Sequence, residues 1–157
     1  MSINKITPCL WFSADDGKLE NIVQYYQEVF GEHFKSKKIV PLGPSPSGYT
    51  EMCEVLIFDS KYSFMNTAIE HQPLNDSISM MISCEDQNEI DHYWNYFTKE
   101  GKEVQCGWCI DRYELRWQII PQHLGQLMAQ SNGWEIMMKQ KKIIIAEYIP
   151  TTKKTNL

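Results

Sequence analysis

Apolar residues follow the same order of patterns in two parts of the chain. Residues 6–12 are interpreted as a strand that places Ile6, Pro8, Leu10 and Phe12 on one face and Thr7, Cys9 and Trp11 on the other, and residues 19–30 carry apolar side chains at helical spacing. Residues 77–83 alternate again, and residues 90–97 carry a second helical stripe. A glycine follows each helical stretch, at a position where helices commonly end. The pattern therefore predicts a strand and then a helix at the start of each half.

The two helical stretches also align residue by residue. The stripes superimpose when these pairs are matched: Ile22 with Ile90, Tyr25 with Tyr93, and Tyr26 with Trp94. Asp86 and Glu89 have the spacing of a capping box at the start of the second helix, and Asp15 or Asp16 is expected to cap the first. The repeat predicts two modules, each built as a strand, a helix and three further strands.

Turn-forming residues divide the rest of the first module. We expect strands at residues 34–40, 51–58 and 62–66, which lie between clusters of turn residues. Residues 41–48 contain three prolines and two glycines, so we expect a surface loop there, a candidate lip over a site. Residues 67–76 are polar and are interpreted as the connection between the halves.

The second module and the residues after it divide in a similar way. Strands are expected at residues 104–108 and 115–120, joined across a turn at 111–114. The second of these strands has the alternation of a half-buried strand, with Leu115, Trp117 and Ile119 against Arg116 and Gln118. Residues 122–140 are expected to form one or two short helices. The apolar run within residues 142–149 predicts a final strand that adds to a sheet edge, with the edge of another subunit as one option.

Composition excludes several classes of protein. The 157 residues are enough for one domain, and 43% apolar residues indicate a packed core. A net charge of −5 provides no basic surface for nucleic acid. No apolar run reaches the roughly 20 residues that span a membrane, and the first residues lack the apolar segment of a signal peptide. Five cysteines, an odd number, indicate reduced thiols, and these observations together favour the cytoplasm.

A motif in the second module carries a resemblance to a known family. Together with the C-E-D at 84–86, the following residues resemble the C-G-W … D … W-Q … P signature of the PhnB-like family: Cys106-Gly107-Trp108, Asp111, Trp117-Gln118 and Pro121. That family belongs to the vicinal-oxygen-chelate superfamily, with glyoxalase I, bleomycin-resistance proteins and extradiol dioxygenases. The resemblance implies an α+β fold in which two βαβββ modules, in a pseudo-twofold arrangement, form a cup-shaped mixed sheet. It implies a single domain over residues 1–157, with module 1 at about 1–68, module 2 at about 76–121 and a C-terminal extension at about 122–157.

The resemblance also indicates where a metal would bind. In metal-dependent members of the superfamily, the ligands come from the first strand of each module and from the last strand of the second. These positions fall on Thr7, Ser77 and Gln118. Two hydroxyls and an amide are poor donors for a divalent metal, which prefers imidazole and carboxylate ligands. We therefore expect no metal and no other cofactor, with a weakly held divalent metal as the alternative.

Without a metal site, the resemblance implies a pocket on the concave face of the sheet. The predicted small-molecule site consists of Thr7, Trp11, Ser77, Ser79, Cys106, Trp108 and Gln118. Aromatic side chains with a few hydroxyls and an amide are typical of such a site. The alternative is that these residues pack the cup shut. Three serines on one face of residues 77–83 make a poor dry core, which favours a cavity.

Cys106 and Cys109 form a C-x-x-C pair, for which three interpretations stay open. The two thiols can be structural or lie at the pocket edge, Cys106 alone can be a catalytic nucleophile, or the two can be a redox pair. A redox pair is activated when its first thiol lies at a helix N-terminus. Because the pattern predicts strands and a turn here, the structural interpretation is favoured.

The sequence thus predicts a small-molecule-binding protein of the PhnB-like family, independent of metal and homodimeric, whose reaction does not follow from its residues. The alternative is an enzyme acting on a small oxygenated or electrophilic substrate through a weakly bound divalent metal or through Cys106. A sequestering resistance protein, which binds without forming product, is a third hypothesis. Members of the family are often named 3-demethylubiquinone-9 3-methyltransferase, but none of the eight glycines forms the G-x-G turn expected for binding S-adenosylmethionine.

Native mass spectrometry of the freshly purified protein tests the expected assembly and composition. We expect twice the mass of the chain, without metal and with a small-molecule adduct. One divalent ion per chain would contradict the metal-independent interpretation and would require a different set of ligand positions.

Overall fold

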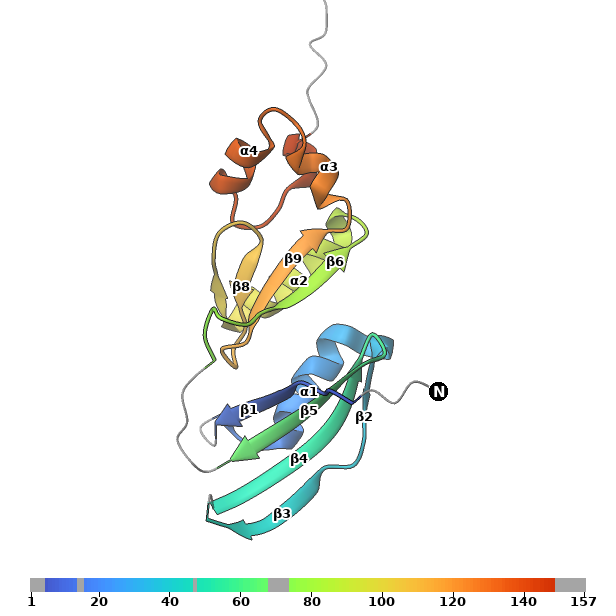
Figure 1. The fold of residues 1–157 in the computed structure, drawn as a ribbon, viewed down its shortest axis with the longest axis vertical. Coiled ribbons are helices and arrows are strands. Elements are labelled where there is room, and N and C mark those ends of the chain that lie inside the picture. The colour runs from blue at the N-terminus through green and yellow to red at the C-terminus, as the bar shows by residue number, and fades with distance from the viewer. Residues whose placement is uncertain (1–4, 14–15, 47, 68–73, 149–157) are drawn as a thin grey trace, which may run out of the picture. The chain divides into compact units, whose positions relative to one another are not determined.

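The computed structural model describes residues 5–13, 16–46, 48–67 and 74–148 (Figure 1). These residues belong to two compact units, residues 1–72 and 73–157, and each unit has its own mixed sheet. Within the described ranges, no helix is long and apolar enough to cross a membrane. The two units are described in turn.

Unit 1 contains one long helix and a five-stranded sheet. Its elements are β1 (Cys9–Ser13), α1 (Leu19–Phe30), the short 3-10 helix η2 (Gly31–His33), β2 (Phe34–Ser36), β3 (Val40–Ser45), β4 (Gly48–Ile57) and β5 (Ser60–Thr67). The strand order is β1-β5-β4-β2, and β3 pairs with the N-terminal half of β4. Strand β1 runs parallel to β5, whereas β4 and β5 are antiparallel.

Unit 2 repeats this topology and adds short helices at its end. Its elements are β6 (Met80–Cys84), α2 (Gln87–Glu100), β7 (Lys102–Glu103), β8 (Trp108–Ile110), β9 (Arg116–Pro121), α3 (Leu124–Met128), α4 (Gly133–Lys139) and the 3-10 helix η3 (Ile145–Tyr148). The strand order is β6-β9-β8-β7, with β6 parallel to β9 and β8 antiparallel to it. The predicted α+β class and the predicted repeat of strand, helix and further strands are confirmed, as are two short helices after β9.

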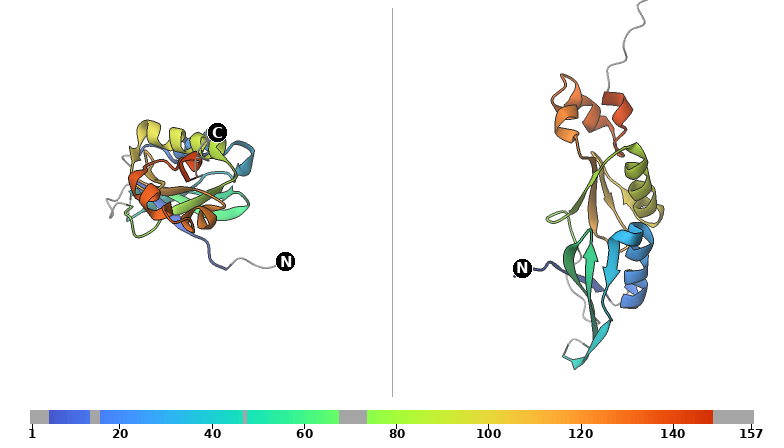
Figure 2. Two further views of the ribbon diagram at one scale, coloured as in Figure 1. Left: turned by 90° about the horizontal axis from the view of Figure 1, so that it is seen from above. Right: turned by 90° about the vertical axis from the view of Figure 1, so that its right-hand side faces the viewer.

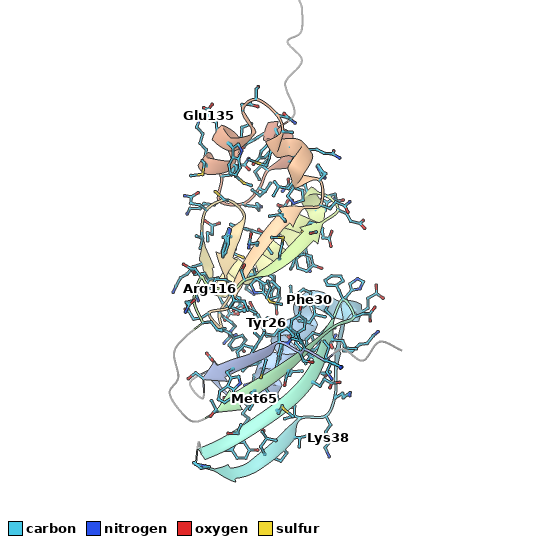
Figure 3. The ribbon with its side chains drawn as sticks, viewed as in Figure 1. Tyr26, Phe30, Lys38, Met65, Arg116 and Glu135 are labelled. Atoms are coloured by element: carbon cyan, nitrogen blue, oxygen red, sulfur yellow. The ribbon has the colours of Figure 1, made fainter. Side chains whose placement is uncertain are left out.

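In each unit a single helix covers one face of the sheet (Figure 2). In unit 1, Phe12 and Tyr26 pack around Phe64, with ring centroids 5.3 and 5.4 Å from it (Figure 3 labels Tyr26). In unit 2, the rings of Phe97 and Trp117 stack with centroids 4.5 Å apart. All six helical residues that align between the halves are buried. Alternation therefore places the intervening strand residues on the opposite face of each sheet.

The sequence predicted the N-terminal cap of α2 better than that of α1. The predicted cap at Asp86 is present in unit 2, because the Glu89 N–H donates to Asp86 Oδ1 (2.9 Å). The return bond of the predicted capping box differs, since Glu89 Oε2 accepts from the N–H of Glu85 (2.6 Å), one residue before the cap. Helix α1 instead begins after Lys18, without a side-chain cap. Asp16 accepts a hydrogen bond from the Ser13 N–H (2.7 Å), so its prediction as cap is wrong. Asp15 lies outside the described residues.

The proline-rich stretch at 41–48 is largely a strand and not the loop that its composition predicts. Strand β3 pairs with β4 from Val40 to Ser45, with a shift of register between Pro41 and Pro44. Proline cannot donate a ladder hydrogen bond, so it is tolerated on an edge strand and at a bulge. Among the described strands β3 pairs only with β4, so it is an edge strand, and two of its prolines flank the shift of register.

Residues 104–107 form a turn between β7 and β8, whereas a strand was predicted at 104–108, of which only Trp108 belongs to a strand. Cys106 and Gly107 have positive φ angles of 59° and 81°. Their N–H groups donate to the carbonyls of Gln140 (2.8 Å) and Lys141 (2.7 Å). A Cβ atom at Gly107 would lie 2.8 Å from a backbone oxygen of β9, so only glycine fits. A contact with the distant C-terminal segment, which the local pattern does not contain, determines this turn.

The apolar run after residue 142 is not the predicted final strand. Ile143 is buried, and its carbonyl accepts from Gln87 Nε2 (3.0 Å), while Gln87 Oε1 accepts from the Ile145 N–H (2.9 Å). The chain then enters η3, where Tyr148 is buried. The segment packs within its own unit and offers no strand to a second subunit, so the predicted homodimer needs another interface. Ile149, the last residue of the predicted strand, lies outside the described residues.

The predicted turn at 111–114 is present and is built on a buried carboxylate. Asp111 Oδ1 accepts from the N–H groups of Tyr113 (2.9 Å) and Leu115 (3.1 Å), and Oδ2 accepts from the indole N–H of Trp117 (2.8 Å). Only 1% of Asp111 is exposed. Hydrogen bonds to a charged group are stronger than those between neutral groups, and loss of the acceptor would leave three buried donors unpaired.

We expect Asp111→Ala to lower the free energy of unfolding by about 3 kcal/mol or more, because buried N–H groups lose their acceptor. Asp76→Ala is the matched control, since Asp76 is 82% exposed in its ion pair with Arg116 and should contribute less than about 1 kcal/mol. Urea unfolding of both variants measures the difference. Equal destabilisation would show that Asp111 is not the organising group of this turn.

Candidate functional site

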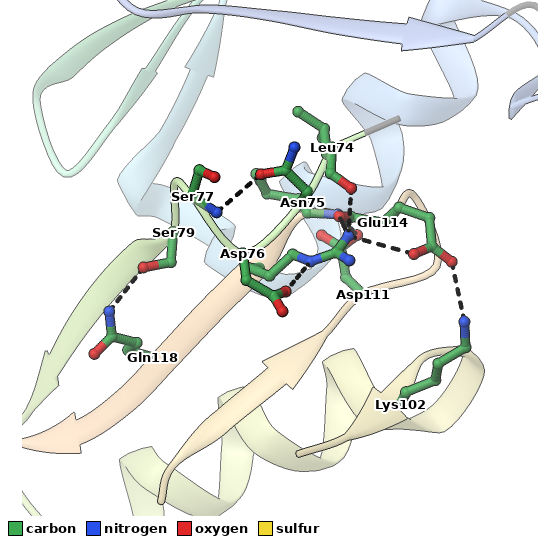
Figure 4. A network of polar contacts seen from close by, with 11 residues as sticks. Leu74, Asn75, Asp76, Ser77, Ser79, Lys102, Asp111, Glu114 and Gln118 are labelled. Carbon is green, nitrogen blue, oxygen red and sulfur yellow. Dashed lines mark hydrogen bonds and ion pairs between the residues drawn. The ribbon is translucent and has the colours of Figure 1, made fainter. Parts of the chain in front are cut away.

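Three of the predicted site residues meet on one face of the unit 2 sheet. Gln118 Nε2 donates to Ser79 Oγ at 2.7 Å (Figure 4). Gln118 on β9 is in register with Trp108 on β8 and with Met81 on β6. Because Trp117 packs against α2, its neighbour Gln118 points to the opposite face. The structure thus forms a row of an aromatic ring, an amide and a thioether, with a hydroxyl at its edge.

Two other predicted residues of unit 2 make different contacts. Ser77 lies in an exposed turn, where its N–H donates to Asn75 Oδ1 (2.9 Å; Figure 4), so the predicted strand at 77–83 begins only at Met80. The Cys106 thiol donates to the carbonyl of Met137 (3.5 Å) and lies 3.9 Å from Met138 Sδ. Cys106 is therefore directed to α4 and is half-buried.

The predicted residues of unit 1 lie on or before β1. Thr7 is half-buried and precedes the strand, whereas Trp11 is in β1 and is 43% exposed. Trp11 is in register with Met65 of β5, on the face opposite the buried side chains of Leu10 and Phe12. That Thr7 and Trp11 form one site with the residues of unit 2 remains a prediction.

The three positions that correspond to metal ligands offer unsuitable donors. Thr7 and Ser77 supply hydroxyls, and the Gln118 amide uses its N–H₂ group for Ser79. A divalent metal at such a site prefers imidazole and carboxylate donors. In the part of the chain that the structure describes, no three His, Cys, Asp or Glu side chains are grouped to hold a metal. These residues do not fit a metal of the kind that the superfamily implies.

Unit 1 contains a cavity that the sequence did not indicate, with a volume of about 960 Å³. It lies between the first half of α1, the connection from β2 to β3, and the ends of β4 and β5. Its polar and charged lining includes Lys18, Glu20, Lys37, Lys38, Glu51 and Asn66 (Figure 3 labels Lys38). Val23 and Pro41 add apolar surface. Pro41 belongs to the stretch predicted as a lip over a site, although that stretch is mostly strand.

Asn66 is the most unusual residue of this lining. It occupies a helix-facing position of β5, two residues after the buried Phe64, and only 9% of it is exposed. Its Nδ2 donates to the carbonyl of Gly17, which fixes the orientation of the amide. Its Oδ1 has no hydrogen-bond partner within the described residues. This oxygen has essentially no accessible surface, so a ligand in the cavity does not reach it, and its burial without a partner costs roughly 1–3 kcal/mol.

Glu51 lies next to Asn66 on the neighbouring strand, since the two are register partners of β4 and β5. Its Oε2 accepts from the Leu19 N–H (3.4 Å) at the start of α1, where the helix dipole favours negative charge. Its Oε1 accepts from the Tyr49 hydroxyl (3.1 Å), and this bond is the main cause that raises the pKa of Tyr49. The Glu51 carboxylate is thus the acceptor that the cavity wall presents.

Three lysines, Lys18, Lys37 and Lys38, also line the cavity. Lys37 pairs with Glu54 (2.5 Å), which also pairs with Lys61, and hydrogen bonds from the two lysines lower the pKa of Glu54. Lys18 and Lys38 are exposed, and neither forms an ion pair with another described residue. Their ammonium groups are therefore available to a ligand. The cavity lining thus combines the Glu51 carboxylate with the ammonium groups of lysines.

Sequence reasoning missed the cavity because its residues come from four separate segments. One signal was nevertheless present: Tyr62, Phe64 and Asn66 alternate along the strand, which places an amide where an apolar side chain is expected. A polar group at a core-facing position needs a partner, and this requirement marks a candidate site. The lysines gave no such signal, because exposed lysines occur on most surfaces.

Comparisons with known proteins give the chain a family. The family model described as 3-demethylubiquinone-9 3-methyltransferase matches residues 4–120. A solved PhnB protein from Bacillus cereus is 20% identical, with a TM-score of 0.64 over 75% of this chain and 99% of that one. Protein PA1353 from Pseudomonas aeruginosa is 16% identical, with a TM-score of 0.51 over 71% and 92% of the two chains. The fosfomycin resistance protein FosX from Mesorhizobium loti is 12% identical, with a TM-score of 0.54 over 83% and 100%.

The family model and the solved structures support different conclusions. No curated protein matches the sequence significantly. The solved structures share little sequence with this chain, so they show the fold, which is that of the glyoxalase and bleomycin-resistance proteins. The family model covers most of the chain, including the C-G-W, D and W-Q residues of the motif. The chain belongs to the PhnB-like family, described as 3-demethylubiquinone-9 3-methyltransferase, within the vicinal-oxygen-chelate superfamily.

Proposed function

We propose that this protein binds a small molecule in the cavity of unit 1. The observation that carries the proposal is a cavity of about 960 Å³ whose lining combines the Glu51 carboxylate and three lysines with apolar surface. Ligand sites commonly have volumes of roughly 300–1,000 Å³ and orient their ligand through a few polar groups.

The fold neighbours support the same class of function. FosX, which shares the fold, is named as a fosfomycin resistance protein, and fosfomycin is a small molecule. The family name suggests methyl transfer, but this activity is outside the proposal. In each unit a single helix follows the first strand and antiparallel strands complete the sheet, unlike the alternating strands and helices of a doubly wound nucleotide-binding fold.

Three further features belong to this proposal. The protein acts without a bound metal, consistent with the hydroxyl and amide donors at the three superfamily positions. It works in the cytoplasm, where its five free cysteines stay reduced. It forms a homodimer, for which Trp134 and Met138 are candidate contacts: they lie one turn apart on α4 and are 69% and 65% exposed.

Substitution inside the cavity tests the binding site. Val23→Trp places an indole in the cavity, and Gln24→Trp places the same group on the exposed side of α1. A library of small polar molecules is screened by ligand-observed NMR against the wild type. We expect ligands that lose roughly tenfold or more in affinity for Val23→Trp, about 1.4 kcal/mol, and bind Gln24→Trp unchanged.

Two results would contradict this site. One is equal binding to both variants, and the other is the absence of any ligand for the wild type. If binding survives Val23→Trp but is lost in Gln118→Leu, the ligand lies instead on the unit 2 sheet face that Ser79, Trp108 and Gln118 form.

An enzyme that uses Cys106 as nucleophile is the second candidate function. Two observations favour Cys106: its thiol is only half-buried, whereas Cys53, Cys84 and Cys109 are buried, and its backbone has a positive φ of 59°, a conformation often found at functional positions. Its proposed redox partner is unsuitable, because burial raises the pKa of the Cys109 thiol to about 12. Burial likewise raises the pKa of Cys84 to about 12.

Alkylation rates separate these interpretations. We expect iodoacetamide at neutral pH to modify exposed Cys9 first and Cys106 more slowly, because the Cys106 thiol is half-buried and donates to Met137. Buried Cys84 and Cys109 should react only after unfolding, since the thiolate is the reactive form. Peptide mass spectrometry over time gives the order. A Cys106 that reacts faster than Cys9 would support the nucleophile, and its replacement by serine would then abolish turnover.

A further inference from the structure

We propose that residues 137–148 form a latch, whose local opening controls the access of electrophiles to the Cys106 thiol. The latch runs from the last turn of α4 into η3. The proposal concerns unit 2 and does not depend on the cavity of unit 1. Two observations carry it: the latch accepts hydrogen bonds from three groups of one turn, and side chains, not a strand ladder, hold it in place.

Three donors of the turn at residues 106–107 are directed to the latch. The N–H groups of Cys106 and Gly107 donate to the carbonyls of Gln140 (2.8 Å) and Lys141 (2.7 Å). The Cys106 thiol donates to the carbonyl of Met137 (3.5 Å). Because all three acceptors belong to one segment, the donors are satisfied together while the latch is closed and are released together when it opens.

Side-chain amides hold the latch to unit 2. Gln87 of α2 donates through Nε2 to the carbonyl of Ile143 (3.0 Å) and accepts at Oε1 from the Ile145 N–H (2.9 Å). Gln140 makes the same two kinds of bond to the backbone of Ile144, at 3.3 and 3.2 Å, within the latch itself. No described residue after β9 belongs to a strand. A segment held in this way opens at a lower free energy than a strand inside a sheet.

Apolar burial keeps the latch closed for most of the time. Ile143 and Tyr148 have exposed fractions of 0% and 1%, so opening returns apolar surface to water and the open state is the minor one. The central contacts of unit 2 lie outside the latch: Phe97 stacks on Trp117, and Asp111 accepts from its own turn and from Trp117. The sheet and α2 therefore stay folded while the latch opens.

The closed latch is an autoinhibitory contact for the thiol. Cys106 is half-buried, and its S–H group is directed to a carbonyl of α4. An electrophile approaches the sulfur freely only after α4 and the residues that follow it have moved. The open state then offers the thiol together with the two adjacent N–H donors of Cys106 and Gly107.

Amide hydrogen exchange of the wild type, measured by NMR, tests whether the latch opens by itself. We expect the N–H groups of Cys106 and Gly107 to exchange roughly hundredfold or more faster than the slowest ladder amides of β6 and β9, after correction for intrinsic rates. The reason is that only the latch must move to release them. If they exchange as slowly as those ladder amides, the latch opens only when unit 2 unfolds, and the proposal is wrong.

Loss of the Gln87 contacts tests the control of the thiol. Gln87→Ala removes both bonds to the latch and also a bond from Nε2 to Asp91 Oδ1 (3.1 Å) one turn along α2. Gln24→Ala is the matched control, because Gln24 makes the corresponding bond to Glu28 (3.1 Å) on the exposed side of α1. Both variants keep the full chain and all five cysteines.

Iodoacetamide is the probe for the open state. The Cys106 sulfur forms a bond to carbon and displaces iodide, and the thiol proton passes to the buffer. We expect Cys106 of Gln87→Ala to react roughly fivefold or more faster than in the wild type, measured against exposed Cys9 of the same chain. Gln24→Ala should leave the ratio unchanged. An unchanged ratio in Gln87→Ala would overturn the proposal, since the latch would not then restrain the thiol.

The buried cysteines distinguish local opening from unfolding. Cys84 and Cys109 should stay unmodified in Gln87→Ala while Cys106 reacts faster. Modification of all three at one rate would show that the latch belongs to the core of unit 2, and this result would also contradict the proposal.

Discussion

The packing of one helix against one face of a sheet is the constraint on which the rest of each unit depends. In unit 2 it is seen in the stacking of Phe97 on Trp117, and in unit 1 in the aromatic cluster around Phe64. Because side chains alternate along a strand, this packing assigns every second residue to the core and its neighbours to the other face. Trp117 thus belongs to the core and Gln118 does not, although the two are adjacent in the chain.

Two buried polar residues show how the same constraint yields structure in one unit and a candidate site in the other. Asp111 is surrounded by N–H donors from its own turn and from Trp117, so its burial stabilises the connection between β8 and β9. Asn66 is also buried and belongs to the lining of the unit 1 cavity, but its Oδ1 has no partner among the described residues. A satisfied polar group contributes to the fold, whereas an unsatisfied one costs free energy.

The C-terminal segment has a structural role that its composition does not reveal. Its backbone carbonyls accept from the N–H groups of Cys106 and Gly107, and its apolar run is held by the Gln87 side chain. The family motif therefore lies between the sheet and this segment. The turn that positions Cys106 exists because residues more than thirty positions later provide the acceptors. This dependence explains why the motif alone does not determine the chemistry of its thiol.

The sequence by itself determined the repeat, the two helices, the burial of their aligned residues and the cap at Asp86, because each follows from local periodicity or from contacts within one helical turn. It also determined the family, through residues of one short motif. Tertiary structure decided the strand at 40–45, the turn at Cys106 and the path of the C-terminal run, because their partners are distant in sequence. It alone decided the cavity, since the environment of Asn66 depends on segments that only folding brings together.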